Sequence, residues 1–149
     1  MESNRQKDLR RKQLGRRGED IAVEMLQLRG MRVIARNVHA GEGEIDIIAL
    51  QSVECAQKRL AFVRFVEVKS RREPVEGDPL EAVNALKQRK IVSAAKAWLA
   101  SGRCSGILRE AGFFEVEEFH FDVITLVWSG DGENCKTEYI EDAFYPIYT

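Results

Sequence analysis

The residues whose types and spacing could do chemistry are Asp46, Glu67 and Lys69. Asp46 belongs to the segment GEIDIIAL (43–50), and Glu67 and Lys69 belong to RLAFVRFVEVKSR (59–71). Both segments have the composition and bounding residues that predict strands. Because successive side chains of a strand point to opposite faces, Glu67 and Lys69 share one face and lie roughly 7 Å apart. One face therefore carries an acid and a base together.

The two strands are expected to form a hairpin. Their connection, residues 51–58, is short enough for antiparallel neighbours, whereas a parallel pair would need a crossover of roughly a dozen residues or more. In a hairpin whose paired positions sum to about 111, Asp46 lies opposite Phe65 and at a diagonal distance of roughly 7 to 8 Å from Glu67. Two carboxylates would then reach one ion.

Two carboxylates flanked by backbone oxygens and water make an oxygen-rich site. Such donors favour Mg²⁺ or Mn²⁺ over zinc, which prefers His and Cys. The sequence therefore predicts a magnesium (or manganese) site at Asp46 and Glu67, with Val68 between Glu67 and Lys69 contributing through its backbone. Lys69 would position or deprotonate a water, or stabilise a developing oxyanion.

An alternative is that Glu67 and Lys69 are an ordinary pair on a solvent-exposed sheet face, which would contribute only a fraction of a kcal/mol. The flanking sequence argues against it, because a nearly continuous apolar strand should be buried on both faces. Burying ionisable groups beside such a strand is costly without a ligand. The apolar residues are Phe62, Val63, Phe65, Val66 and Val68.

The elements that must position these residues can be read along the chain. Helical periodicity covers residues 18–28, and Gly30 follows as a C-cap. Asp78, Pro79 and Glu81 are typical of a helix start and open a long helix to about Ser101. Extended segments are expected at 31–38, 43–50, 59–71, 114–128 and 136–144, the last an edge strand after a turn at 129–134. The order α-β-β-β-α-β-β predicts an α/β sandwich around a mixed sheet.

Several of these stretches together resemble a known family over most of residues 15–145. They are GRRGEDIAVEMLQLRG, ARNVHAGEGEIDIIAL, FVEVKSR, Lys87 and the closing IEDAF. The chain resembles the YraN-type family of predicted endonucleases, which is similar to the Holliday-junction-resolvase branch of the PD-(D/E)XK, restriction-endonuclease-like superfamily. The resemblance implies a restriction-endonuclease-like sandwich, a mixed sheet flanked by helices. Ile45 stands where the superfamily's PD pair has its proline.

The resemblance also implies roles for individual residues. Asp46 and Glu67 would be metal ligands, Lys69 the catalytic lysine, and Glu19 would reach the site from the first helix. Glu19 has an alternative role as a helix N-terminal acid favoured by the helix dipole. Glu44 shares the face of Asp46, but it could instead hold a turn or a basic neighbour.

Basic residues near these motifs are candidates for phosphate binding. Arg71 and Arg72 follow the motif strand and could clamp a backbone phosphate, although surface arginines at a strand end need no special role. Lys87, Arg89 and Lys90 interrupt the apolar face of the long helix, so this turn faces either solvent or the phosphates of a substrate.

The charge of the chain is strongly polarised. The net charge is -1, but residues 1–109 carry 22 Lys+Arg against 14 Asp+Glu, and residues 110–149 carry one Lys against ten acids. The basic part can attract polyanions such as nucleic acid, although uneven surface charge is a sufficient reason. Residues 1–17 hold seven Lys+Arg and form either a mobile basic arm or the start of a helix. Residues 18–149 are expected to form a single domain.

Other residue types narrow the class of protein. Three widely spaced cysteines offer neither a disulfide framework nor a zinc cluster, which favours a cytoplasmic location. No apolar run approaches the roughly 18 residues of a membrane span. His39 and His120 lack partners at catalytic or zinc spacing and are expected to be structural, and Asp122 is expected to make structural hydrogen bonds.

Two functions remain at this point. The first is a cytoplasmic Mg²⁺-dependent endonuclease that hydrolyses DNA, with branched or junction-like DNA as one candidate substrate. The second is a non-catalytic nucleic-acid-binding or adaptor protein that retains the fold. In either case the C-terminal edge strand could pair with a second copy and form a homodimer.

Overall fold

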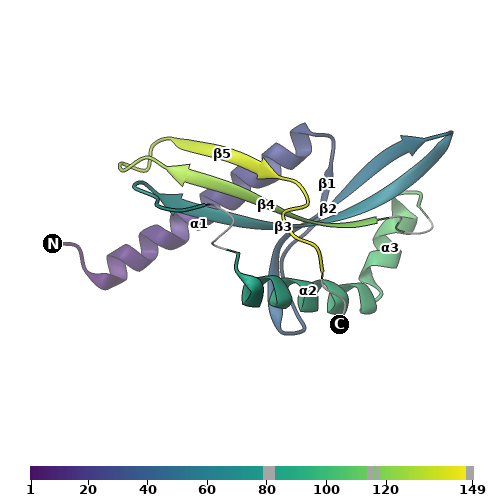
Figure 1. Ribbon diagram of the computed structural model, residues 1–149, viewed down its shortest axis with the longest axis horizontal. Helices are drawn as coiled ribbons and strands as arrows, with labels where there is room; N and C mark the ends of the chain where they lie inside the picture. The colour runs from purple at the N-terminus through teal and green to yellow at the C-terminus, as the bar shows by residue number, and fades with distance from the viewer. Residues whose placement is uncertain (79–82, 114–115, 117, 147–149) are drawn as a thin grey trace.

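The computed structural model describes all residues except 79–82, 114–115, 117 and 147–149 (Figure 1). The described residues form three helices and five strands. In chain order these are α1 (Asn4–Leu28), β1 (Arg32–Ala40), β2 (Gly43–Cys55), β3 (Lys58–Arg72), α2 (Ala85–Ala100), α3 (Arg103–Glu110), β4 (Glu118–Trp128) and β5 (Cys135–Ile140).

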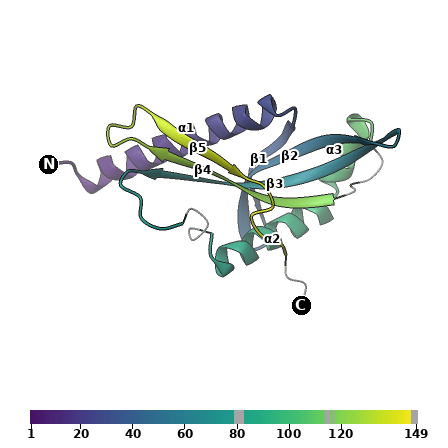
Figure 2. The ribbon, with the colours of Figure 1, turned by 45° about the horizontal axis from the view of Figure 1, so that its top comes forward.

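The strands form one mixed sheet in the order β1-β2-β3-β4-β5. β3 and β4 pair in parallel, and the other neighbours are antiparallel. The parallel pair needs a long crossover, which contains α2 and α3. The predicted α/β class and mixed sheet are confirmed, and α1 lies on one face of the sheet while α2 and α3 lie on the other (Figures 1 and 2).

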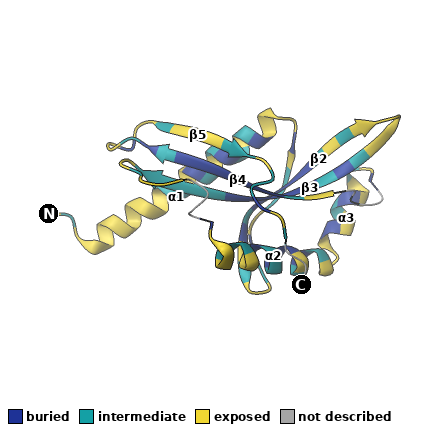
Figure 3. Cartoon of the chain, in the orientation of Figure 1, coloured by how far each residue is buried: buried dark blue, intermediate teal, exposed yellow. Residues whose placement is uncertain are grey.

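The core is divided by the sheet into two apolar layers, and the buried stretches of the strands are dark blue in Figure 3. Val63 and Phe65 of β3 pack with Ile91 and Trp98 of α2. Val66, the next residue of β3, packs in the opposite layer with side chains of α1 such as Leu26 and Ala22. β3 is therefore buried on both faces, as its apolar sequence predicted.

The register of the β2–β3 hairpin differs from the prediction by two residues. Cys55 pairs with Lys58 across a turn at Ala56 and Gln57, so the paired positions sum to 113, and Phe65 lies opposite Ile48 rather than Asp46. Both turn residues have positive φ, which is the geometry of a two-residue hairpin turn. A shift of two keeps every side chain on its predicted face.

The long helix begins later than predicted. Asp78 is not its N-cap, because α2 begins after Asn84, whose side chain accepts a hydrogen bond from the Lys87 N–H at 2.9 Å. Pro79 and Glu81 lie outside the described residues. The helix ends at Ala100 as expected, and Gly102 with φ 80° separates it from α3, a helix that the sequence did not predict.

Two strands also have ends that differ from the predicted ones. The expected strand 114–128 begins in the structure at Glu118, and 114, 115 and 117 are outside the described residues. β5 ends at Ile140, before a turn at Asp142 with φ 49°. The basic segment is helical from Asn4 onward, so it forms the first part of α1. Across the described parts of the chain, no helix is long and apolar enough to cross a membrane.

Candidate active site

Asp46 lies where β2 separates from β3. The last recorded pair of the two strands is Ile47 with Val66, and one residue further the Asp46 Oδ2 accepts a hydrogen bond from the Val68 N–H at 2.8 Å. The Asp46 carboxylate therefore accepts from a backbone N–H of β3 at the point where β2 no longer pairs with that strand. Val68 contacts Asp46 through this N–H.

Two glycines hold this end of β2 against α2. A Cβ at Gly43 would lie 2.4 Å from the Lys90 carbonyl oxygen, and one at Gly41 would lie 2.7 Å from the Ser93 hydroxyl. Side chains at these positions would push the β1–β2 turn away from the helix. Gly41, and Gly43 at the start of GEID, thus set the approach of Asp46 to the site.

The carboxyl groups of Asp46 and Glu67 hydrogen-bond to each other. Glu67 is 5% exposed, and burial, together with the charge of Asp46, raises its pKa to about 7. Burial also raises the pKa of Asp46, against the effect of the Val68 N–H. Near neutral pH the pair therefore holds a proton that two separate carboxylates would have lost.

Lys87 provides a positive charge next to Glu67. Its Nζ lies 3.2 Å from the Glu67 Oε1, and although burial opposes its charge, Glu67 and Asp46 raise its pKa. The first turn of α2 directs Lys87 at Glu67, a contact that the sequence did not predict, while its side chain stays 40% exposed, and phosphate contact by Lys87 stays a prediction. Arg89 and Lys90 of the same turn are exposed.

Glu19 reaches toward the site from α1. Its Oε1 is buried and has no hydrogen-bond partner among the described residues. Burial raises its pKa, followed by the charge of Asp46. The neighbouring Gly18 permits this close packing, because a Cβ there would lie 3.0 Å from the Ser70 hydroxyl. Glu19 lies more than three turns from the start of α1 at Asn4, so the helix-dipole alternative is excluded.

Lys69 lies on the α2 side of β3 by strand alternation, two residues beyond Glu67. It is half-buried, and no ion pair joins it to an acidic residue in the described ranges. Glu44 is exposed, lies 3.7 Å from the His39 Nε2, and raises the pKa of Asp46. We call Glu19, Glu44, Asp46 and Glu67 the acidic cluster.

Comparison with known proteins places this site in a family. The model of the "Uncharacterised protein family UPF0102" matches residues 18–126, a range that contains the whole acidic cluster, Lys69 and Lys87. The chain belongs to the UPF0102 family. The UPF0102 protein of Syntrophotalea carbinolica is 39% identical over 131 residues, which cover 88% of this chain and 90% of the relative. That of Dictyoglomus turgidum is 34% identical over 133 residues, covering 89% and 98%.

The donor atoms of this UPF0102 protein fit a hard divalent cation. Asp46, Glu67 and Glu19 offer carboxylate oxygens, which Mg²⁺ and Mn²⁺ prefer, and Glu19 has an unsatisfied one. Within the described ranges, no three Asp, Glu, His or Cys side chains already converge as a metal site. The two hydrogen-bonded carboxyls would therefore have to release their shared proton to solvent when a cation binds.

The remaining predicted residues of the UPF0102 chain lie elsewhere. His120 lies between two acids, with Nδ1 2.5 Å from Asp142 and Nε2 2.7 Å from Glu118, which fits the structural role predicted for it. Arg71 and Arg72 end β3 and line a pocket beyond the acidic cluster.

Asp122 makes the structural hydrogen bonds that were predicted. It is fully buried and accepts hydrogen bonds from the Arg64 guanidinium at 3.0 and 3.1 Å. It also accepts from the Tyr139 hydroxyl at 2.5 Å and the Asp142 N–H at 2.9 Å.

Proposed function

We propose that this UPF0102 protein is a cytoplasmic nuclease that hydrolyses DNA phosphodiester bonds with the help of a divalent metal ion. The single observation that carries the proposal is the hydrogen-bonded pair of the buried Glu67 and the half-buried Asp46 beside Lys69. A buried pair of like charges raises the pKa values of its members, and such perturbed groups concentrate at functional sites. The mixed sheet between helices and the resemblance of the motifs to PD-(D/E)XK nucleases of the restriction-endonuclease-like fold support it.

Asp46 and Glu67 would hold the ion, Mg²⁺ or Mn²⁺, and Glu19 would face it from α1. When bound, such an ion polarises a phosphodiester oxygen and lowers the pKa of a bound water. The backbone of Val68 lies within reach of the same position through its contact with Asp46.

The other charged residues have separate tasks in this proposal. Lys69, which has no acidic partner in the described ranges, is the group available to orient or deprotonate a water or to stabilise the developing oxyanion. Lys87 orients the Glu67 carboxyl through their 3.2 Å contact and balances part of its charge. Arg71, Arg72, Arg89 and Lys90 would contact phosphates of the DNA backbone.

Junction-like DNA and a homodimer belong to the same proposal. β5 is an edge strand of the sheet, so its free side could pair with a second copy of the chain. A dimer would present two acidic clusters to one branched substrate. Sedimentation of the protein with and without four-way DNA tests this, and a monomer in both cases would contradict it.

A cleavage assay tests the nuclease proposal. Labelled linear duplex, single-stranded and four-way DNA are incubated with the protein in Mg²⁺ or Mn²⁺, beside Lys69→Ala and the control Lys58→Ala. Lys58 is exposed at the far end of the same strand. We expect Lys69→Ala to lower the rate by roughly 10²- to 10⁴-fold and Lys58→Ala to leave it unchanged. Equal cleavage by the wild type and Lys69→Ala would mean that a contaminant acts, and the proposal would fail.

A second candidate is a nucleic-acid-binding or adaptor protein without catalysis. The observation that favours it is that, in the described ranges, no three ligating side chains already converge. In that case binding to DNA should depend strongly on salt, because it releases counterions, and should not depend on divalent metal. Binding isotherms with and without EDTA separate the two functions.

A further inference from the structure

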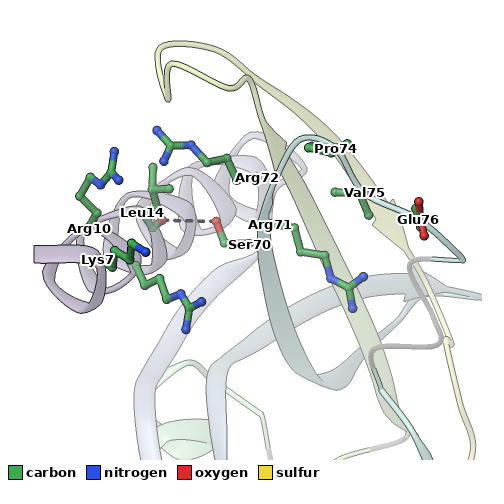
Figure 4. Close-up of a pocket in the computed structure, with 10 residues that line it drawn as sticks. Lys7, Arg10, Leu14, Ser70, Arg71, Arg72, Pro74, Val75 and Glu76 are labelled. Carbon is green, nitrogen blue, oxygen red and sulfur yellow. Dashed lines mark hydrogen bonds between the residues drawn. The ribbon is translucent and has the colours of Figure 1, made fainter. Parts of the chain in front are cut away.

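A basic pocket opens between the N-terminal half of α1 and the end of β3 (Figure 4). Five cationic side chains line it, and its volume is about 660 Å³. Glu76 is the one acid among the described residues that line it. The cations that define the basic pocket are Lys7, Arg10, Arg11, Arg71 and Arg72.

The wall that α1 contributes is fixed in place. Leu14 lies in the pocket wall, and its carbonyl oxygen accepts a hydrogen bond from the Ser70 hydroxyl at 3.4 Å (Figure 4). The same hydroxyl accepts from the Trp128 Nε1 at 2.5 Å. Arg17 stacks on Trp128 at 4.5 Å and donates to the Gly132 carbonyl oxygen at 3.1 Å. The helix is thus attached to the ends of β3 and β4, and its preceding turns overhang the pocket.

The turns of α1 that precede this attachment contribute little to the hydrophobic core. The first buried residue of α1 is Gly18, and the turns before it are largely exposed (Figure 3). They are nevertheless capped, because the Ser3 hydroxyl accepts from the Gln6 N–H and the Gln6 side chain accepts from the Ser3 N–H. A capped helix that packs so few of its own side chains indicates that its exposed face has another use.

Two of the five cations of the pocket have an acidic neighbour: Arg10, and Arg72, whose charge lowers the pKa of Asp131. Arg10 forms an ion pair with Glu2. In the described ranges, no acidic group lies within 4.0 Å of the charged ends of Lys7, Arg11 or Arg71. The Arg72 Nε is buried without a hydrogen-bond partner there. Cations held together with an unsatisfied donor favour an anion with several oxygens.

We propose that the basic pocket binds phosphates of a nucleic-acid strand, with Lys7 and Arg11 of α1 acting together with Arg71 of β3. The inference rests on the proposed function, because it assumes that DNA is the substrate. Arg71 follows Glu67 by four residues of one strand, or about 13 Å. A DNA duplex rises about 3.4 Å along its axis per base pair. A bound duplex of several base pairs is therefore long enough to reach both the acidic cluster and the pocket, which makes α1 part of the proposed substrate site.

The helix offers a matched control. Lys7, Arg11 and Leu14 lie on one side of α1, because residues follow each other by about 100° around a helix. Arg5 and Lys12 lie on the opposite side and do not line the pocket. The test variant is Lys7→Gln/Arg11→Gln and the control is Arg5→Gln/Lys12→Gln, so each loses one Lys and one Arg from the same helix. Thermal unfolding checks that both variants fold like the wild type.

Binding to a labelled 30-base-pair duplex is measured in EDTA at several salt concentrations, so that no cleavage interferes. We expect Lys7→Gln/Arg11→Gln to bind about tenfold or more weakly at low salt. The slope of log K against log salt should become shallower by about 2, since each lost phosphate contact removes about 0.9. The control should bind within twofold of the wild type and keep its slope.

Other outcomes decide against the inference or separate it from the nuclease proposal. Equal losses in both variants, or no loss in either, would overturn the pocket as the binding site. If an equal concentration of tripolyphosphate displaced the duplex, the ligand of the basic pocket would be a small polyphosphate, and the proposal of a nucleic-acid ligand would be wrong. Selective loss in Lys7→Gln/Arg11→Gln, with no cleavage by the wild type in Mg²⁺, would support the pocket and refute the nuclease.

Discussion

Two groups of charges, each with at least one buried carboxyl, lie on the central strands and differ in how the protein compensates them. Asp122 faces the opposite charge of Arg64, and both of its oxygens accept hydrogen bonds, including one from the Tyr139 hydroxyl. Asp46 and Glu67 instead face each other, with Lys87 as the nearby cation. The first group is complete within the protein, whereas the second is a site where a further positive charge would be stabilised.

This difference separates charges that are compensated within the protein, here the structural set, from the charges of Asp46 and Glu67 that we propose to be functional, here the functional set. In the first group both carboxylate oxygens accept hydrogen bonds, and removing one partner of such a buried pair of opposite charge is strongly destabilising. A buried pair of like charge raises its own pKa values and costs folding free energy unless a proton or a cation lies between the carboxyls. Neutralising one carboxylate should therefore change the free energy of unfolding in opposite directions in the two sets.

The largest effect is expected at the structural set. Asp122→Asn leaves the Arg64 guanidinium buried without its counter-charge, so the free energy of unfolding should fall by about 3 to 5 kcal/mol. Urea unfolding at pH 7 measures it. Asp8→Asn, at an exposed ion pair with Lys12, is the control and should cost at most about 1 kcal/mol. A loss below 1 kcal/mol for Asp122→Asn would remove the distinction between the two sets.

A smaller effect of opposite sign is expected at the functional set. The pKa of Glu67 is about 7 in the folded protein and 4.5 without its surroundings, so the folded state keeps a proton that the unfolded state loses between these values. This contribution to the free energy of unfolding is complete below pH 4.5 and is lost as pH rises to about 7. Glu67→Gln does not titrate and should therefore be more stable than the wild type at pH 8, on the order of 2 kcal/mol.

Urea unfolding at pH 4.5, 6 and 8 measures this difference, with the exposed Glu138→Gln as control. The advantage of Glu67→Gln should be near zero at pH 4.5 and grow with pH, while Glu138→Gln follows the wild type. A Glu67→Gln protein that is less stable than the wild type at pH 8 would show that the acidic pair is structural after all.

The arrangement of the functional set could be predicted largely from strand alternation. The face of the sheet to which a side chain points depends only on whether its position is odd or even. The prediction therefore placed Asp46 and Glu67 on one face even though the predicted register was wrong by two residues. The error arose because Ala56 and Gln57 carry none of the Asn or Gly signals of a two-residue turn. Family resemblance added Glu19, whose closeness to Asp46 depends on how α1 packs.

Contacts between distant elements could not be predicted. The pairing of Arg64 with Asp122 follows from the register of the parallel strands β3 and β4, which no turn specifies. The contact of Lys87 with Glu67 depends on the start of α2 at Asn84, and Asp78, Pro79 and Glu81 gave a stronger sequence signal for a helix start. The basic start of α1 has no apolar periodicity, so its sequence did not distinguish a wall of a pocket from a solvated arm.

Calorimetric titration with Mn²⁺ at pH 7.5 tests most directly whether the acidic cluster is a cation site. The wild type and the control Asp8→Asn should bind the ion with the same heat, and Asp46→Asn should show none, because it loses one of the two proposed ligands. Absence of heat in the wild type, or unchanged heat in Asp46→Asn, would contradict the account.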